Sequence, residues 1–289
     1  MLIELDDGRR LELTAVGPAD GRALVLHLGT PSGPVDVPAL SGPAAERGLR
    51  TVTCGRPGYA GSTPRPGRRV ADVAGDVAAV LDRLGYQRFV TLGWSGGGPH
   101  ALACAALLPR RCAAAASLAG VAPYEADGLD WVAGMAAENV EEFAAAAAGP
   151  DALTAFLERA SVELRTVTGD DVATALGGLV SPVDVDALAG AFADELAATL
   201  RAAVSTGIAG WRDDDLAFVQ PWGFDPSTID VPVAVWQGGE DRMVPAAHGA
   251  WLGQRVPGAR AHLEPDAGHL SLVNAAGRIL DDLLAAAGW

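Results

Sequence analysis

The chain has 289 residues, enough for one large domain or a domain with an insertion, so no disulfide or metal is needed to stabilise it. Its formal net charge of -15 disfavours a phosphate-backbone partner, and we expect no nucleic-acid binding. All 21 basic residues are arginines. The absence of lysine excludes Schiff-base chemistry, a pyridoxal phosphate anchor and a P-loop, and we predict no metal and no organic cofactor.

The three cysteines, Cys54, Cys104 and Cys112, are odd in number and scattered, which is typical of reduced thiols rather than a disulfide framework. No stretch reaches the roughly 18 apolar residues of a membrane span, and the N-terminus does not resemble a signal peptide. We therefore expect a soluble, cytoplasmic protein with no membrane partner.

The first part of the chain alternates strand-like and helix-like runs. Two apolar runs at 2–5 and 11–16 flank an Asp-Gly turn and predict a β-hairpin. The runs that follow predict strands at 23–28, 50–53, 88–92 and 113–118, and helices at 39–47, 70–84 and 101–108. Strands that are apolar throughout and separated by helices predict right-handed crossovers in a mainly parallel sheet.

From residue 122 to 225 this alternation stops, and the sequence becomes helical and alanine-rich. The helices predicted there cover 138–148, 151–164, 170–180 and 184–204. Beyond them the pattern predicts a strand at 231–237, a helix at 246–255, a strand at 259–263 and a closing helix at 270–287. The predicted fold is α/β, with a core of residues 1–121 and 226–289 and a helical cap of residues 122–225 over the strands' carboxyl ends.

The pattern Gly-Trp-Ser-Gly-Gly at residues 93–97 lies between a predicted strand and a predicted helix. A serine in G-x-S-x-G can occupy a strained strand-to-helix turn with its hydroxyl exposed, because the glycines leave room for the crowded turn. Ser95 is therefore the candidate nucleophile.

Of the five histidines, His269 is the candidate general base, since it follows the last strand on a loop at the same sheet edge as Ser95. We expect His27 to order the first glycine loop, residues 29–33, and His100 to point away from the serine on its helix. His248 is expected to be exposed to solvent, and His262 lies within the last strand.

An acid should orient the histidine ring, and Asp241 follows the strand at 231–237. Glu240 is the alternative, and Glu125 with Asp127 forms a weaker second site. The backbone N–H groups of Gly96 and Thr30 are the candidate oxyanion donors, because Pro31 has no N–H.

These motifs resemble the α/β-hydrolase superfamily, in particular its lidded branch of proline iminopeptidase-like and small-ester hydrolases. The segment 27–31 is similar to the family's oxyanion loop, the segment 56–62 to its second loop, and the order Ser95, Asp241, His269 to its triad. Leu28 separates the usual histidine-glycine pair, which leaves Gly29 or Thr30 as the donor.

The resemblance implies a serine hydrolase that cleaves a small carboxylic ester, or a related amide or lactone, through an acyl-enzyme. The partner is then a small-molecule substrate, and whether the chain forms a homo-oligomer stays open. Tryptophans are predicted to line the substrate pocket: Trp94, Trp131, Trp211 and Trp222.

Three alternatives remain. A carbon–carbon bond hydrolase could use the same triad, and a hydrolase fold can also serve as a ligand-binding or signalling protein. An iminopeptidase-like enzyme would need cap carboxylates to receive an amino terminus. The sequence has candidates that we expect on a helix surface: Glu138, Glu141, Glu142 and Glu158.

Overall fold

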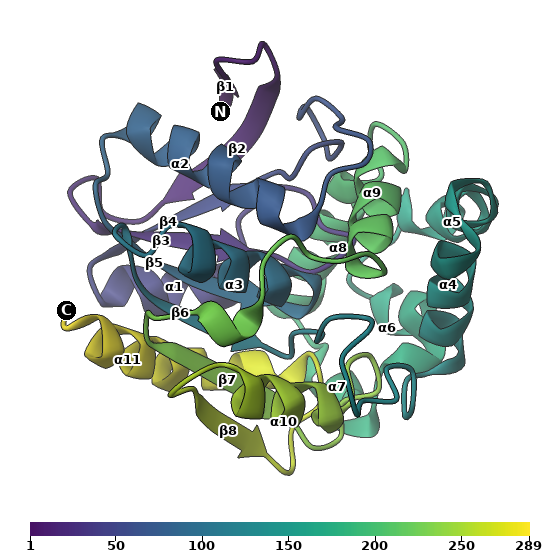
Figure 1. The fold of residues 1–289 in the computed structure, drawn as a ribbon. Coiled ribbons are helices and arrows are strands. Elements are labelled where there is room, and N and C mark those ends of the chain that lie inside the picture. Colours follow the sequence, from purple (N-terminus) through teal and green to yellow (C-terminus); the bar gives the residue numbers. More distant parts are fainter.

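The eight strand-like runs of the sequence pair into one sheet, in the order β1-β2-β4-β3-β5-β6-β7-β8. The computed structural model describes all residues, 1–289 (Figure 1). The strands are β1 (Leu2–Glu4), β2 (Arg10–Val16), β3 (Arg22–His27), β4 (Leu49–Cys54), β5 (Phe89–Trp94), β6 (Cys112–Leu118), β7 (Val233–Gly238) and β8 (Arg260–Glu264). The pairs β1–β2 and β2–β4 are antiparallel and all the others are parallel, which confirms the predicted mainly parallel α/β sheet.

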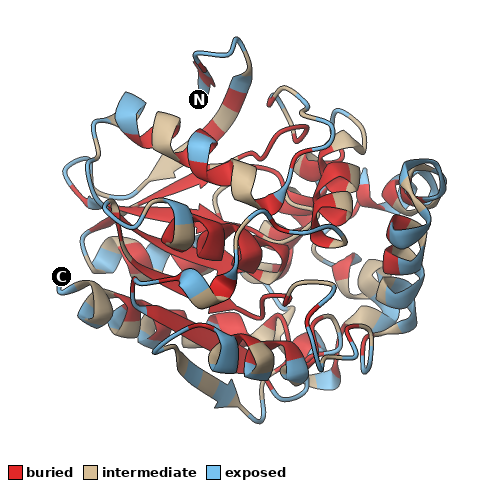
Figure 2. Cartoon of the chain, in the orientation of Figure 1, coloured by how far each residue is buried: buried red, intermediate tan, exposed pale blue.

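Helices cover both faces of the sheet because its central strands are apolar on both sides (Figure 2). In β3, Leu24 and Leu26 join one buried cluster, and Ala23 and Val25 join the other. The first face packs against α1 (Pro38–Glu46) and α11 (Ala276–Ala287), and the second against α2 (Val73–Leu84), α3 (Gly98–Leu107) and α10 (Ala246–Arg255). Crossovers of this kind bring the carboxyl ends of β3, β5, β7 and β8 to one edge.

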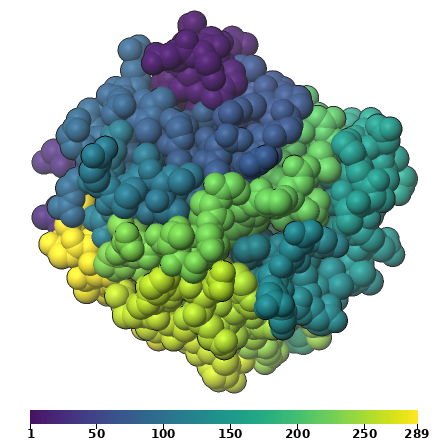
Figure 3. All heavy atoms as spheres, viewed as in Figure 1, coloured from purple at the N-terminus to yellow at the C-terminus, as the bar shows by residue number.

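The segment between β6 and β7 is helical, as predicted, and we refer to residues 122–225 as the inserted segment. Its helices are α4 (Ala137–Ala148), α5 (Pro150–Leu164), α6 (Val172–Leu176), α7 (Pro182–Ala187), α8 (Ala191–Ala203) and α9 (Ala209–Phe218). In the space-filling view its teal and green atoms lie beside the blue N-terminal half (Figure 3).

Two of the helices predicted in this segment are wrong in extent. The run 184–204 divides into α7 and α8 at Gly190, whose φ is 57°. The run 170–180 ends as an α-helix at Leu176, before Gly177 at φ 56°. Glycine adopts this left-handed conformation without the cost that a side chain adds, so these positions interrupt the helices.

Helix α9 was not predicted at all. It contains three consecutive aspartates, Asp213, Asp214 and Asp215, and such a run is typical of a solvated surface. All three are buried in the structure. Asp214 pairs with Arg56 and Arg68 from the segment before α2, Asp213 pairs with Arg212 of α9 itself, and Asp215 has no basic partner.

All three cysteines are free thiols. No helix has both the length and the apolar character required to cross a membrane.

Candidate active site

Ser95 occupies a strained turn between β5 and α3. Its φ is 56°, in the left-handed region that costs a residue with a side chain about 1–3 kcal/mol. A Cβ at Gly93 would overlap the carbonyl oxygen of Gly97, and a Cβ at Gly97 would overlap that of His27. Only glycine therefore fits at either position, which is the packing that the G-x-S-x-G pattern predicts.

His269 and Asp241 come together as the sequence predicted. The Nδ1 atom of His269 lies 2.8 Å from Oδ2 of Asp241, and the two residues are 2% and 6% exposed. The other oxygen, Oδ1, accepts from the N–H groups of Met243 and Val244 at 2.9 and 2.8 Å. Glu240 is exposed, as is Glu125, so the structure places neither of these alternatives at the histidine.

The environment of His269 favours its protonated form. Burial lowers the pKa of this imidazole, but the adjacent Asp241 carboxylate and the charge of Asp184 more than offset burial, and the pKa of His269 is raised above its ordinary value. Trp94 stacks on the ring with a centroid separation of 6.1 Å and donates from Nε1 to the His269 carbonyl oxygen at 3.2 Å. The imidazole is therefore oriented from two sides.

Asp184, in α7 of the inserted segment, holds the loop that carries His269. Its carboxylate accepts from the N–H groups of His269, Leu270 and Ser271 at 2.9, 2.8 and 2.8 Å. Burial raises the pKa of this carboxyl, but these three backbone donors together with the charge of His269 lower it below its usual value. The sequence contains no local signal for this contact, because the partners lie 85 to 87 residues apart.

The candidate oxyanion donors lie side by side next to Ser95. A Cβ built on Gly96 would come within 2.5 Å of Thr30 Oγ1, and one built on Gly29 would lie 3.2 Å from Ser95 Cβ. None of the backbone hydrogen bonds outside regular helices and strands uses the Thr30 N–H. Gly96 is the second residue of the helical turn that begins at Ser95, where partial positive charge collects.

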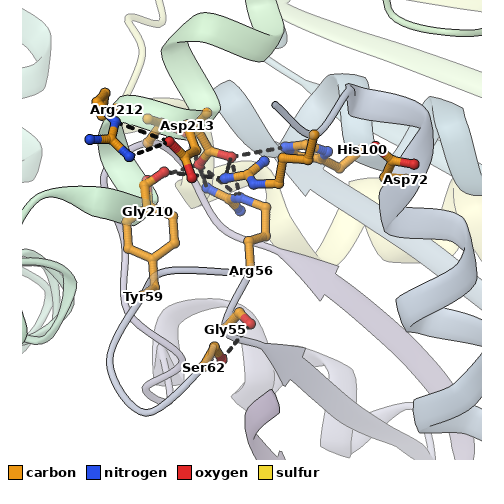
Figure 4. A network of polar contacts seen from close by, with 12 residues as sticks. Gly55, Arg56, Tyr59, Ser62, Asp72, His100, Gly210, Arg212 and Asp213 are labelled. Carbon is orange, nitrogen blue, oxygen red and sulfur yellow. Dashed lines mark hydrogen bonds and ion pairs between the residues drawn. The ribbon is translucent and has the colours of Figure 1, made fainter. Parts of the chain in front are cut away.

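A buried ionic network fixes the loop that contains Thr30 (Figure 4). Oδ2 of Asp214 accepts from Thr30 Oγ1 at 2.9 Å, from Arg56 Nη2 at 2.6 Å and from the Tyr59 hydroxyl at 2.8 Å. Arg68 Nη2 lies 2.6 Å from Oδ1. Arg56 also donates to the carbonyl oxygens of Leu28 and Gly29, both at 2.8 Å. These contacts connect helix α9 to the loop that contains Gly29 and Thr30.

Two histidines lie near this network without reaching the site. His100 is fully buried, with Nε2 3.5 Å from Asp214 Oδ1, and burial lowers its pKa to about 4 despite that carboxylate. Figure 4 shows its ring directed toward the polar network that contains Arg56. His27 is buried, with Nε2 3.6 Å from the sulfur of Cys104.

The remaining histidines lie elsewhere. The expectation that His248 is exposed is wrong: it is 1% exposed, accepts at Nδ1 from the Ala122 N–H at 3.1 Å and contacts the Trp131 carbonyl oxygen at 2.8 Å. His262, in β8, stacks on Trp236. Only His269 lines the cavity described next.

A cavity of about 520 Å³ lies between the inserted segment and the strand ends. Ser95, Gly96, Thr30 and His269 line one part of it. Apolar side chains from the inserted segment line much of the rest: Phe143, Phe156, Leu164, Leu196, Leu200 and Phe218.

Of the four tryptophans predicted at the substrate, two line this cavity, Trp94 and Trp211. Trp131 does not, because its Nε1 donates to the Ala122 carbonyl oxygen at 2.7 Å and its ring packs on Tyr124 and His248. Trp222 packs on Phe224 beside a separate hollow. Tryptophan identity alone does not distinguish a pocket wall from the core of the inserted segment.

Two of the α4 carboxylates, Glu138 and Glu141, are exposed as expected of a helix surface, whereas Glu142 is half-buried. Glu138, Glu141 and Glu142 line the cavity, together with Asp215 of α9, whereas Glu158 is exposed and lies outside it. No cluster of three or more His, Cys, Asp or Glu side chains is arranged to hold a metal ion.

The chain matches the family model described as the alpha/beta hydrolase fold over residues 23–276. Solved structures with the same fold include an esterase from Exiguobacterium antarcticum, with 17% identity, a TM-score of 0.70 and coverage of 100% of this chain and 99% of that one. An enol-lactonase from Burkholderia xenovorans has 21% identity, a TM-score of 0.64 and coverage of 99% and 100%. A bromoperoxidase from Bacillus anthracis has 20% identity, a TM-score of 0.68 and coverage of 96% of each chain. No curated protein matches the sequence.

Proposed function

Because this chain belongs to the alpha/beta hydrolase fold family, we propose that it is a serine hydrolase that cleaves a small carboxylic ester through an acyl-enzyme. The observation that carries the proposal is the 2.8 Å contact between His269 and Asp241 at the wall of the cavity that also contains the strained Ser95. A related amide or lactone would use the same groups.

In the first half of the reaction, Ser95 Oγ attacks the ester carbonyl carbon and His269 Nε2 takes the hydroxyl proton. Asp241 stabilises the imidazolium that forms, because its carboxylate already accepts from Nδ1. The N–H groups of Gly96 and Thr30 bind the oxyanion, and each such donor contributes about 3–4 kcal/mol to the transition state.

Collapse of this intermediate breaks the bond to the alkoxy group, which leaves as an alcohol with the proton from His269. In the second half, His269 takes a proton from water, whose oxygen attacks the acyl carbon. When the bond between the acyl carbon and Ser95 Oγ breaks, His269 gives that proton to Oγ, which releases the carboxylic acid and restores Ser95. The inserted segment acts as the cap of this site, and its phenylalanine and leucine side chains hold the acyl or alkyl group. The esterase and lactonase among the structural neighbours are consistent with this chemistry but share the fold alone.

A fluorophosphonate probe tests the nucleophile. The wild-type protein should be labelled and should hydrolyse short p-nitrophenyl esters, and Ser95→Ala should abolish both. Ser32→Ala is the matched control, because Ser32 also lines the cavity and should not carry the label. Labelling of Ser95→Ala at the wild-type rate would refute the assignment. A folded wild type that neither reacts nor turns over, yet binds a small apolar ligand, would favour the ligand-binding alternative.

A further inference from the structure

Two carboxyl groups from different helices meet in the cavity, at a place the proposed reaction does not use. Glu142 of α4 and Asp215 of α9 both line the cavity, and Trp211 of α9 connects the two helices through its hydrogen bond to Glu142. Oε1 of Glu142 accepts from Trp211 Nε1 at 2.6 Å, and Trp211 lies one helical turn before Asp215. These three side chains form one polar corner of the cavity wall.

The Asp215 carboxyl lacks a donor from the protein. Its side chain receives none of the N–H or O–H donations that satisfy the neighbouring Asp214, and its buried Oδ2 has no partner although the residue is only 1% exposed. Leaving a buried carboxylate without a donor is costly unless the group is protonated or a ligand supplies the donor.

The charges around the pair balance only when the two carboxyls share one proton. Arg56 and Arg68 contribute two positive charges and Asp214 one negative charge, and all three are buried. One negative charge on the pair then makes the cluster neutral. Burial raises the pKa of both Glu142 and Asp215, and mutual repulsion raises that of Asp215 further, which agrees with one shared proton.

The rest of the cavity also favours a cation over an anion. Glu138 and Glu141 of α4 and Glu163 of α5 add carboxylates to its lining, which outnumber the two side chains there that can carry positive charge, Arg159 and His269. A carboxylate-bearing ligand would therefore be repelled, whereas an ammonium group would be attracted and could replace the shared proton between buried Asp215 and half-buried Glu142.

We propose that Glu142 and Asp215 bind a protonated amino group of the substrate, so that the ester cleaved at Ser95 carries an ammonium group on its acyl chain. This assignment rests on the proposed esterase function. When the ammonium binds, its N–H groups donate to both carboxylates, Trp211 keeps its hydrogen bond to Glu142, and the shared proton leaves to solvent.

Matched p-nitrophenyl esters test the preference. Esters of ω-aminoalkanoic acids with two to five methylenes between the ammonium and the carbonyl are compared with alkanoic esters in which a methyl group replaces the ammonium. At the best length we expect kcat/KM to favour the amino ester by about 10- to 100-fold, the range for a hydrogen bond to a charged group. Asp215→Asn and Glu142→Gln should each reduce this ratio toward unity, whereas Glu158→Gln, outside the cavity, should retain it.

A ratio near one in the wild type, or a preference that survives both cavity variants, would overturn the proposal while leaving the esterase function intact. If neither ester is hydrolysed, the esterase function fails, and calorimetry of n-hexylammonium binding to Ser95→Ala still decides the amine site. Binding at neutral pH should release a proton, seen as an enthalpy that varies with the ionisation heat of the buffer, and should be lost in Ser95→Ala/Asp215→Asn. Equal binding to the two proteins would contradict the proposal.

Discussion

Asp214→Asn should uncouple helix α9 from the oxyanion loop. The side chain keeps its size but loses the charge that pairs with Arg56 and Arg68, each at 2.6 Å and 3% exposed. Two buried guanidinium groups then face a neutral amide, and breaking a buried ion pair on one side costs about 3–5 kcal/mol. Thr30 also loses its carboxylate acceptor, so the loop with its N–H is less firmly held.

We expect the free energy of unfolding, measured by urea denaturation, to fall by about 3–5 kcal/mol. Among the molecules that remain folded, kcat for a p-nitrophenyl ester should fall at least about 10-fold, because a displaced oxyanion donor weakens transition-state binding. Asp213→Asn is the matched control: Asp213 is also buried in α9 but pairs with the partly exposed Arg212 and does not contact Thr30. A stable, fully active Asp214→Asn protein would mean that this carboxylate neither stabilises the fold nor positions Thr30.

His269 must be neutral to act as a base, and its pKa is raised, so kcat/KM should fall with decreasing pH at a midpoint above about pH 6.5. Asp241→Asn removes the carboxylate that raises this pKa and should move the midpoint to lower pH. The stability that Asp241 gives protonated His269 is present below about pH 6.5 and lost as pH rises through the folded-state pKa, so an unfolding series from pH 5 to 9 should show it declining. Asp184→Ala leaves three backbone N–H groups without their acceptor, so the free energy of unfolding measured by urea denaturation should fall by about 3 kcal/mol or more, and kcat should fall as well. An unaltered kcat would show that Asp184 does not position the loop that carries His269. Trp131→Phe removes one buried hydrogen bond and should cost about 1 kcal/mol with KM unchanged, whereas Trp211→Phe should alter KM for the ester.

The core of the site could be predicted from sequence because each of its parts has a local signature. The glycines around Ser95 are required by a close backbone approach, and Asp241 and His269 each follow a strand in a sheet whose parallel order was evident from its apolar runs. Such signals can be recognised in the sequence because the geometry of a turn or of a strand end restricts which residues fit there, whatever the rest of the chain does.

The contacts that support this core could not be predicted in the same way. Asp214 lies 158 residues from Arg56, and Asp184 lies 85 residues from His269, so no spacing in the sequence connects them. A run of aspartates such as the one in α9 is typical of a solvated surface, and the burial of Asp214 is favourable only because Arg56 and Arg68 reach it from a distant loop. Glu142 and His248 were expected at the surface for the same reason, because their hydrogen-bond partners, Trp211 and Ala122, lie far away in the sequence.

In the proposed reaction, Ser95 carries the acyl group during turnover. Rapid mixing with a p-nitrophenyl ester, followed by acid quench, proteolysis and mass spectrometry, measures where the acyl mass is attached. We expect an adduct on the peptide that contains Ser95, absent from Ser95→Ala. An adduct on another residue, or turnover by Ser95→Ala at the wild-type rate, would contradict the assignment of Ser95 as the nucleophile.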